Sequence, residues 1–570
     1  MKSLKQVWAA AQRIPNVPHG GTMLRRNDIF EMTCENFGQD AQGVCRHDGM
    51  AVFVPGMLPG ERAMVRIVKP EKRYAFGRIE QLLQSAPERT EPFCPIYKRC
   101  GGCSCQHMTY DTSLRFKQDQ VQQLLTRVGG LDITVPPVIG MDEPFAYRNK
   151  GAYPVGEVKG EPACGFFAPR SHDLVALPRQ GCMIQRADAN DATRAVLDWM
   201  KQSGARAYDE VSGKGLVRHI MTRSTQVGGL MVVLVVTRRD IPRMELLIEL
   251  LRKAVPGLVS LCLSINSRRT NVILGEEIHV LWGEGVMEDT LHGLKFSVSP
   301  LSFFQVNPVQ TEKLYQLALD YAQLTGSETV VDAYCGAGTI SLMLAEKAKR
   351  VIGIEIVEPA IENANANAAR NGITNAEFIV GATEDVLPRL IADGMRPDVI
   401  VVDPPRKGCE EAVLQAIIES RPERVVYVSC GAPTLARDAR ILTEGGYKAE
   451  KVQCVDMFCW TGAVETVMLF SKLEAAKHID IELEMSELDI TEAETNKGAT
   501  YEEIKAYVLE QTGLKVSTLY IAQVKQKYGI IERECYNKPK SDDSKQPKCP
   551  FEKEQAILSA LKHFDMLPAS

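Results

Sequence analysis

The stretch TVVDAYCGAGT, residues 329–339, decides the fold of this chain of 570 residues. Its first three residues are β-branched, which suits a buried parallel strand. Asp332 and a Gly-Ala-Gly turn at 336–338 follow, and residues 340–347 can continue as a helix. A glycine turn between a strand and a helix lets a ligand approach the backbone closely. The stretch therefore predicts a ligand site at the strand end of a Rossmann-like domain.

Glu355 supplies a second feature of the same site. It ends an apolar stretch, residues 350–354, and follows Gly336 by about 20 residues, a spacing that suits a carboxylate accepting hydrogen bonds from ribose hydroxyls. The turn reads GAG rather than GxGxxG, so a dinucleotide is disfavoured and S-adenosylmethionine is the better prediction.

Further predicted strands extend the sheet. They cover residues 378–380, 397–402 and 424–430 and alternate with helical stretches, which predicts an open parallel α/β sheet with helices on both faces. Ligands of such sheets bind beyond the carboxyl ends of the strands. Four reactive side chains fall at these ends: Asp332, Glu355, Asp403 and Cys430. So many reactive groups on one rim are hard to attribute to packing, and they predict a reactive site.

The composition is that of an ordinary globular protein, with 45% hydrophobic and 24% charged residues. The length predicts three or four domains. A net charge of -5 neither indicates nor excludes nucleic-acid binding, because a local basic face suffices. The chain shows neither an apolar run of ~20 residues nor a signal-peptide core, so we expect no membrane partner and a cytoplasmic location.

Residues 27–86 read as a small β-barrel that follows a basic leader, residues 1–26. Short apolar runs alternate there with glycine and proline turns. Basic residues are interleaved with Tyr74 and Phe76; they are Arg62, Arg66, Lys69, Lys72, Arg73 and Arg78. Such a surface offers phosphate charge and base stacking to single-stranded nucleic acid. A solvated barrel face explains the pattern equally well.

A dense group of cysteines follows the barrel. Cys94, Cys100 and Cys103 have the close spacing of ligands that converge on one metal centre, and 16 cysteines in a reducing compartment are unlikely to form a disulfide framework. Zinc and iron–sulfur clusters both use four thiolates, so the motif alone does not decide between them. The candidates for a fourth ligand are Cys105, Cys164 and Cys182.

The rest of the chain divides into four regions. Residues 87–130 hold the cysteines and a helix predicted over 109–129, residues 131–300 a mixed α/β region, residues 301–472 the Rossmann-like domain, and residues 473–570 a helical appendage. The mixed region includes a predicted strand over 230–236 and a predicted helix over 243–254.

The appendage is predicted to hold three helices. Thr500 and Glu503 form a capping box that opens the first, and helices over 518–528 and 552–564 follow. The first two resemble a helix-turn-helix, and residues 478–485 alternate like an edge strand. An auxiliary RNA-binding element and a protein-docking bundle are equally compatible with this pattern.

Five motifs together resemble the S-adenosylmethionine-dependent RNA uracil-5 methyltransferases, particularly the bacterial iron–sulfur enzymes that act on 23S ribosomal RNA. They are SFFQVN (302–307), DAYCGAGT (332–339), DPPRKG (403–408), VSC (428–430) and VETV (464–467), with Glu355 as the acidic ribose ligand. The resemblance runs in consistent order from about Asn27 to Lys472.

The resemblance implies a complete reactive site. Cys430 would be the nucleophile that adds to C6 of a uridine, and Glu465 the base that removes the C5 proton, giving 5-methyluridine. The implied cofactor residues are Gln305, Tyr334, Glu355 and Asp403. The residues alone leave two other interpretations of Glu465, which follows Val464 and precedes Thr466 and Val467: a buried structural carboxylate, or a residue of an edge strand.

The resemblance also implies a 4Fe–4S cluster and an RNA partner. The implied cluster ligands are Cys94, Cys100, Cys103 and Cys182, and the barrel resembles a TRAM domain. We expect a monomer that acts on 23S rRNA. The alternatives are the same reaction on tRNA, whose enzymes in this family typically lack the four cysteines, and a non-catalytic RNA-binding protein, which has no need of a nucleophile with a paired base.

Overall fold

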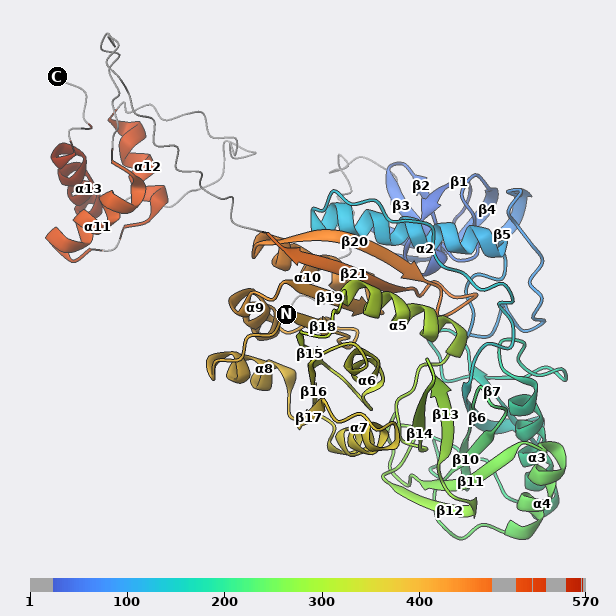
Figure 1. Ribbon diagram of the computed structural model, residues 1–570. Helices are drawn as coiled ribbons and strands as arrows, with labels where there is room; N and C mark the ends of the chain where they lie inside the picture. The colour runs from blue at the N-terminus through green and yellow to red at the C-terminus, as the bar shows by residue number, and fades with distance from the viewer. Residues whose placement is uncertain (1–23, 474–498, 515, 529–549, 565, 567–570) are drawn as a thin grey trace. The chain divides into compact units, whose positions relative to one another are not determined.

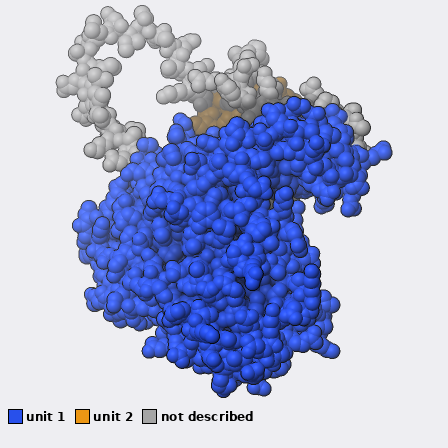
Figure 2. All heavy atoms as spheres, turned by 90° about the vertical axis from the view of Figure 1, so that its right-hand side faces the viewer, with its two compact units in different colours: residues 1–475 blue, residues 476–570 orange. Residues whose placement is uncertain are grey.

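The computed structural model describes residues 24–473, 499–514, 516–528, 550–564 and 566. The chain divides into two compact units, residues 1–475 and 476–570 (Figure 2). The predicted strand over 478–485 and most of the leader lie outside the described residues. Within the described part, no helix has the length and apolar character needed to cross a membrane.

The first domain is the predicted barrel. Its strands are β1 (Ile29–Phe37), β2 (Gly43–His47), β3 (Met50–Val54), β4 (Arg62–Pro70) and β5 (Tyr74–Gln84). They close in the order β1-β2-β3-β5-β4, so every strand has two neighbours and no open edge is left. Alternate residues point inward, and side chains such as Val52, Val65 and Ile67 are fully buried.

A helix and a mixed sheet follow the barrel. Helix α2 (Tyr110–Leu124) is capped by Thr109, whose hydroxyl accepts from the Thr112 N–H, and it continues as a wider turn to Gly129. The sheet has the order β12-β11-β10-β9-β6-β7-β8. Its strands are β6 (Lys150–Val158), β7 (Glu161–Phe167), β8 (Leu174–Ala176), β9 (Val217–Ser224), β10 (Leu230–Val236), β11 (Leu258–Ile265) and β12 (Glu277–Gly283).

Two helices and a hairpin complete this region. Helices α3 (Ala187–Ser203) and α4 (Met244–Ala254) share one apolar core with the sheet. Strand β10 has the predicted bounds, and α4 begins one residue later than predicted. Strands β13 (Met287–Leu291) and β14 (Leu294–Val298) form a separate hairpin whose side chains pack into a core with the next domain.

The Rossmann-like sheet has the order β17-β16-β15-β18-β19-β21-β20, and Figure 1 shows its strands stacked in this order. Its strands are β15 (Thr329–Ala333), β16 (Arg350–Glu355), β17 (Ala376–Val380), β18 (Val399–Val402), β19 (Arg424–Ser429), β20 (Tyr447–Val455) and β21 (Glu465–Lys472). The first five of these are parallel, as predicted, but β21 runs antiparallel to both β19 and β20. The parallel arrangement expected from the sequence is therefore confirmed for these five strands, and β21 is the one strand of this sheet that runs in the opposite direction.

Helices cover both faces of this sheet, as the alternation predicted. One face packs against α8 (Thr383–Ala392), α9 (Glu411–Ser420) and α10 (Ala432–Glu444), and the other against α5 (Pro308–Ala322), α6 (Thr339–Ala345) and α7 (Glu358–Arg370). Strands buried on both faces explain the continuous apolar runs, such as Val399–Val402.

The second unit contains three helices around a small apolar core. They are α11 (Tyr501–Thr512), α12 (Thr518–Lys527) and α13 (Phe551–His563). The predicted capping box is present, with the Thr500 and Glu503 side chains each accepting from the other's backbone. Lys525 is only 2% exposed, and Lys527 forms an ion pair with Glu554.

Candidate functional site

All six side chains predicted for catalysis and cofactor binding line one cavity of about 700 Å³. They are Gln305, Tyr334, Glu355, Asp403, Cys430 and Glu465. The last residue of β16, the residue after β18 and the residue after β19 supply three of them, because parallel strands end at the same edge of the sheet. The fold thus brings together residues that are up to 160 positions apart in the sequence, from Gln305 to Glu465.

The loop after β15 is shaped to receive a ligand. Tyr334 and Gly336 both have left-handed backbones, at φ 76° and φ 55°. The Glu355 carboxylate accepts from the N–H groups of Gly336 (3.2 Å) and Val357 (2.9 Å), which fixes its position at the rim. Residue 336 has open space where a Cβ would lie, so glycine is required by the backbone angle rather than by crowding.

Asp332 has an oxygen that the described residues leave without a partner. One carboxylate oxygen accepts from the Ser341 hydroxyl, whereas Oδ1 is buried and has no hydrogen-bond partner among the described residues. Burial raises the pKa of Asp332 to about 6. An unpartnered buried oxygen is costly, so a group that donates to it on entering this cavity would be favoured.

Cys430 and Glu465 come from adjacent antiparallel strands. Cys430 directly follows β19, Glu465 is the first residue of β21, and Ser429 pairs with Thr466 across the two strands. Because β21 lies between β19 and β20, the edge-strand alternative for Glu465 is wrong. Glu465 is only 3% exposed. It lines the same cavity as the Cys430 thiol.

Burial raises the pKa of the ionisable groups at the centre of the cavity. Burial raises the pKa of Asp403 to about 7, and Asp332 adds a smaller effect in the same direction. Burial also raises the pKa of Glu465 to about 8, and Asp403 adds a smaller effect. Burial and these two carboxyl groups raise the pKa of the Cys430 thiol to about 11. Arg406 acts in the opposite direction on Cys430 and Glu465. Burial in this cavity therefore favours the neutral forms of Asp403, Glu465 and Cys430.

Other residues also line this cavity, among them Phe303, Arg406 and Phe458, for which no role was predicted from the sequence. Arg406 lies within the DPPRKG motif, and its charge acts on both the thiol and the base. Phe303 is 69% exposed although it lines the cavity, and Phe458 lies in the loop that leads to β21. Phe303 and Arg406 lie within the SFFQVN and DPPRKG motifs, so the sequence offered a signal for both, whereas Phe458 lies outside every quoted motif.

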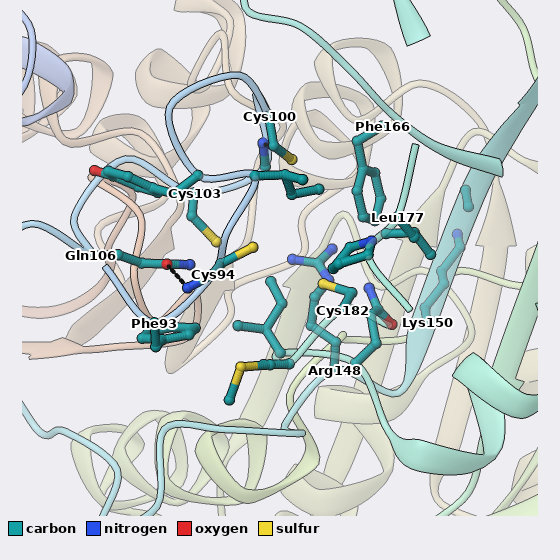
Figure 3. A pocket seen from close by; sticks show the side chains of 18 residues that line it. Phe93, Cys94, Cys100, Cys103, Gln106, Arg148, Lys150, Phe166, Leu177 and Cys182 are labelled. Carbon is teal, nitrogen blue, oxygen red and sulfur yellow. Dashed lines mark hydrogen bonds between the residues drawn. The ribbon is translucent and has the colours of Figure 1, made fainter. Parts of the chain in front are cut away.

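The four cysteines of the predicted cluster line a second cavity, of about 290 Å³. Figure 3 shows the side chains of Cys94, Cys100, Cys103 and Cys182 around the same space. The two other candidates do not line it: Cys105 and Cys164 are buried in separate apolar cores.

The lining of this second cavity includes four cysteines and, among the described residues, no carboxylate or imidazole. Within the described residues, no three Cys, His, Asp or Glu side chains are close enough to hold one metal ion. A 4Fe–4S cluster binds one thiolate at each iron, so its ligands need not meet at one atom. Arg148 and Lys150 also line the cavity and offer positive charge to an anionic cluster. The Gly102 N–H donates to the Cys100 sulfur (3.4 Å), an interaction that stabilises a thiolate ligand.

The barrel surface carries less unpaired charge than its sequence suggested. Four of the six basic residues are ion-paired: Arg62 with Glu31, Arg66 and Arg78 with Glu80, and Lys69 with Glu71. Tyr74 and Phe76 pack edge to face beside Phe53, and Arg170 of the β7–β8 loop lies 5.4 Å from the centre of the Phe76 ring. The aromatic part of the predicted RNA surface is thus assembled, and the basic part is mostly neutralised.

Comparisons with known proteins agree with this architecture. Residues 287–473 match the tRNA (Uracil-5-)-methyltransferase family, and residues 25–79 match the TRAM domain. The crystal structure of Pyrococcus abyssi tRNA (uracil-54, C5)-methyltransferase in complex with S-adenosyl-L-homocysteine has a similar fold. It superposes with a TM-score of 0.63 at 24% identity, over 77% of this chain and 100% of that chain.

Two bacterial relatives are similar over almost their whole length. An uncharacterized RNA methyltransferase of Halalkalibacterium halodurans is 48% identical over 446 residues, which are 78% of this chain and 97% of the relative. One of Listeria innocua is 46% identical over 451 residues, 79% of this chain and 99% of the relative. The chain therefore belongs to the RNA uracil-5 methyltransferase family.

Proposed function

We propose that this protein transfers a methyl group from S-adenosylmethionine to C5 of a uridine in 23S rRNA through a covalent cysteine–C6 adduct. The observation that carries the proposal is the cavity in which Cys430 and Glu465 face the same space as the four predicted cofactor residues. A protein that only binds RNA does not need a nucleophile and a base in one pocket.

The reaction needs a nucleophile because C5 of uracil is too weakly nucleophilic to be methylated directly. The Cys430 thiolate adds to C6, which makes an enolate with electron density on C5. Bound S-adenosylmethionine supplies the electrophilic methyl group. Glu465 then takes the C5 proton, the C–H electron pair forms the C5=C6 bond, and the C6–S bond breaks to return the thiolate.

The cofactor residues have complementary tasks in this proposal. Glu355, held by two backbone N–H groups, would accept from the ribose hydroxyls. Gln305, Tyr334 and Asp403 would contact the remainder of the cofactor. The target uridine has to leave its RNA stack to reach Cys430, as is general for enzymes that modify a base.

We also propose that Cys94, Cys100, Cys103 and Cys182 hold a 4Fe–4S cluster. Their common cavity and the absence of carboxylates and imidazoles from its lining support this assignment. The methyl transfer has no redox step, so the cluster would stabilise the fold and the RNA-contact region. The cytoplasmic location and the monomeric state stay predictions.

The choice of 23S rRNA over tRNA depends on the resemblance to the four-cysteine rRNA enzymes. The structural neighbour is a tRNA enzyme, but a likeness at 24% identity informs on fold alone. The discriminating experiment offers methyl-labelled S-adenosylmethionine with unmodified 23S rRNA and, separately, with bulk tRNA.

The expected result is labelled 5-methyluridine in 23S rRNA, no label with Cys430→Ala, and retained activity with Cys262→Ala, a buried cysteine of β11 remote in sequence from the site motifs. Label in tRNA alone would identify tRNA as the substrate in place of 23S rRNA and would leave the proposed reaction unchanged. No label in either RNA from a protein that binds the cofactor would overturn the uracil assignment.

A further inference from the structure

The loop of residues 456–464 connects β20 to β21 and leads directly into Glu465. Phe458 of this loop and Glu465 both line the reactive cavity. The path of the loop therefore sets the position at which β21 begins and from which the Glu465 carboxylate approaches the reacting base.

Helix α2 binds this loop through a buried ion pair. Lys117 of α2 and Asp456 of the loop form the pair, and both side chains are 0% exposed. The Lys117 ammonium also donates to the Phe458 carbonyl (3.2 Å). The Tyr110 hydroxyl donates to the Asp456 carboxylate (2.6 Å) and accepts from the Met141 N–H (3.0 Å). Hydrogen bonds from two side chains of α2 thus fix the first residues of the loop.

The opposite side of the loop is fixed by the cysteine segment. The N–H groups of Ser104 and Cys105 donate to the Trp460 carbonyl (2.9 and 3.0 Å), and the Gly462 N–H donates to the Ser104 hydroxyl (3.1 Å). The Tyr147 hydroxyl donates to the Cys459 carbonyl (3.1 Å). The loop is therefore held along its whole length before it reaches Glu465.

A fully buried ion pair is a poor source of net stability, because both charges lose their hydration. It is a strong constraint on geometry, since moving the loop away would leave a buried charge without its partner. A general base must lie within hydrogen-bond distance of the proton that it removes. An ion pair that fixes the position of the loop therefore serves this purpose even if it adds little to the stability of the fold.

We propose that Lys117 and Asp456 are positioning residues that hold loop 456–464 so that Glu465 reaches the C5 proton of the covalent adduct. The proposal rests on the proposed function. Addition of Cys430 to C6 and methylation of C5 precede the step in which Glu465 acts. Loss of the ion pair should therefore slow release of the RNA from Cys430 more than it slows formation of the adduct.

The test measures adduct formation and RNA release separately. Each enzyme is mixed with labelled S-adenosylmethionine and the 23S rRNA substrate, quenched by denaturation at successive times, and assayed for label in the covalent protein–RNA band and in free RNA. We expect Lys117→Met to slow release by about 10²-fold, the cost of a small misplacement of a catalytic group, with near-normal adduct formation. Glu465→Gln serves as the reference for release without the proposed base.

Two further variants keep the test decisive. Tyr110→Phe removes one hydrogen bond to Asp456 and leaves the ion pair in place, so the covalent protein–RNA adduct should accumulate to a smaller degree. If Lys117→Met does not fold, Tyr110→Phe alone decides the question. Arg89→Met is the matched control, because Arg89 pairs with the buried Glu61 between the barrel and the cysteine segment and does not contact the loop.

Release at the wild-type rate in the folded variants would overturn the proposal. So would an equal slowing of formation and release, the pattern expected of Arg89→Met if it merely loosens the fold. Failure of the proposed function looks different, because then neither the wild type nor Glu465→Gln forms any covalent RNA complex.

Discussion

Cys430 and Glu465 occupy adjacent positions across one pair of antiparallel strands. Ser429, the last residue of β19, pairs with Thr466, the second residue of β21, so one more step along each strand leads to the thiol and to the carboxylate. The pairing of β19 with β21 therefore contributes to the relative placement of the two residues, together with loop 456–464, which leads into Glu465.

Glu465→Gln should separate methyl transfer from product release. The amide cannot accept the C5 proton, so the methylated RNA stays bound to Cys430. We expect release to fall by about 10²- to 10⁴-fold, the usual contribution of a general base. The measurement is a protein–RNA band that survives denaturation and carries the methyl label.

Glu377→Gln is the control for this variant. Glu377 lies in β17 of the same sheet and forms an exposed ion pair with Arg350, outside the cavity. It should release RNA normally. Wild-type turnover by Glu465→Gln would instead show that another group removes the proton.

The charge of the cofactor should activate the Cys430 thiol. Its pKa of about 11, raised mainly by burial and then by Glu465 and Asp403, keeps the thiol protonated at neutral pH. A cation near these groups favours the thiolate and lowers the pKa. S-adenosylmethionine carries a sulfonium charge that S-adenosylhomocysteine lacks. Comparing the two ligands therefore isolates the effect of this charge on the pKa of the thiol.

The readout is the rate of alkylation of Cys430 against pH, followed by mass spectrometry of its peptide. With S-adenosylmethionine the pH midpoint of alkylation should lie below the midpoint measured without a ligand, and with S-adenosylhomocysteine it should stay closer to the ligand-free midpoint. Identical midpoints for the two ligands would show that the sulfonium charge does not act on the thiol.

Local patterns were sufficient to predict the rim of the sheet. Asp332, Glu355, Asp403 and Cys430 each follow an apolar run whose burial on two faces marks a parallel strand, and parallel strands end at one edge. No such argument placed Glu465, since its antiparallel strand is inserted between β19 and β20 by a pairing that no local pattern encodes.

The other contacts that the sequence did not predict also join residues that are far apart in the chain or lie on different strands. Cys182 was selected from three candidates only through the family resemblance, because it joins Cys94, Cys100 and Cys103 from a loop about 80 residues away. The Lys117–Asp456 pair connects positions 339 residues apart, and a lysine in an amphipathic helix ordinarily faces solvent. The carboxylates that neutralise the barrel arginines come from neighbouring strands and were equally invisible to a linear pattern.

Cys182→Ser should abolish the cluster, whereas Cys105→Ser should retain it. Cys182 lines the cavity with the other three cysteines, and Cys105 lies in a separate apolar core. We expect about four iron atoms per chain in the wild type and in Cys105→Ser after anaerobic purification, and a loss of iron and of visible absorbance in Cys182→Ser. Iron retained by Cys182→Ser and lost by Cys105→Ser would reverse the assignment of the fourth ligand.

Lys72 and Arg73 should provide most of the barrel's contribution to RNA binding. Both are exposed at the β4–β5 turn beside Tyr74, and neither forms an ion pair within the described residues. A cation already paired with a carboxylate releases fewer counterions on meeting a phosphate, because its charge is partly neutralised.

The double variant Lys72→Ala/Arg73→Ala should therefore weaken RNA binding and lower the slope of log K against log salt by about 2, one for each phosphate that the variant no longer neutralises. Its kcat at saturating RNA should stay unchanged, because neither residue lines the reactive cavity. Arg62→Ala, which removes a cation paired with Glu31, is the matched control and should change the slope less. An equal or larger change in Arg62→Ala would mean that the ion pairs open when RNA binds, and that the barrel charge is available to RNA after all.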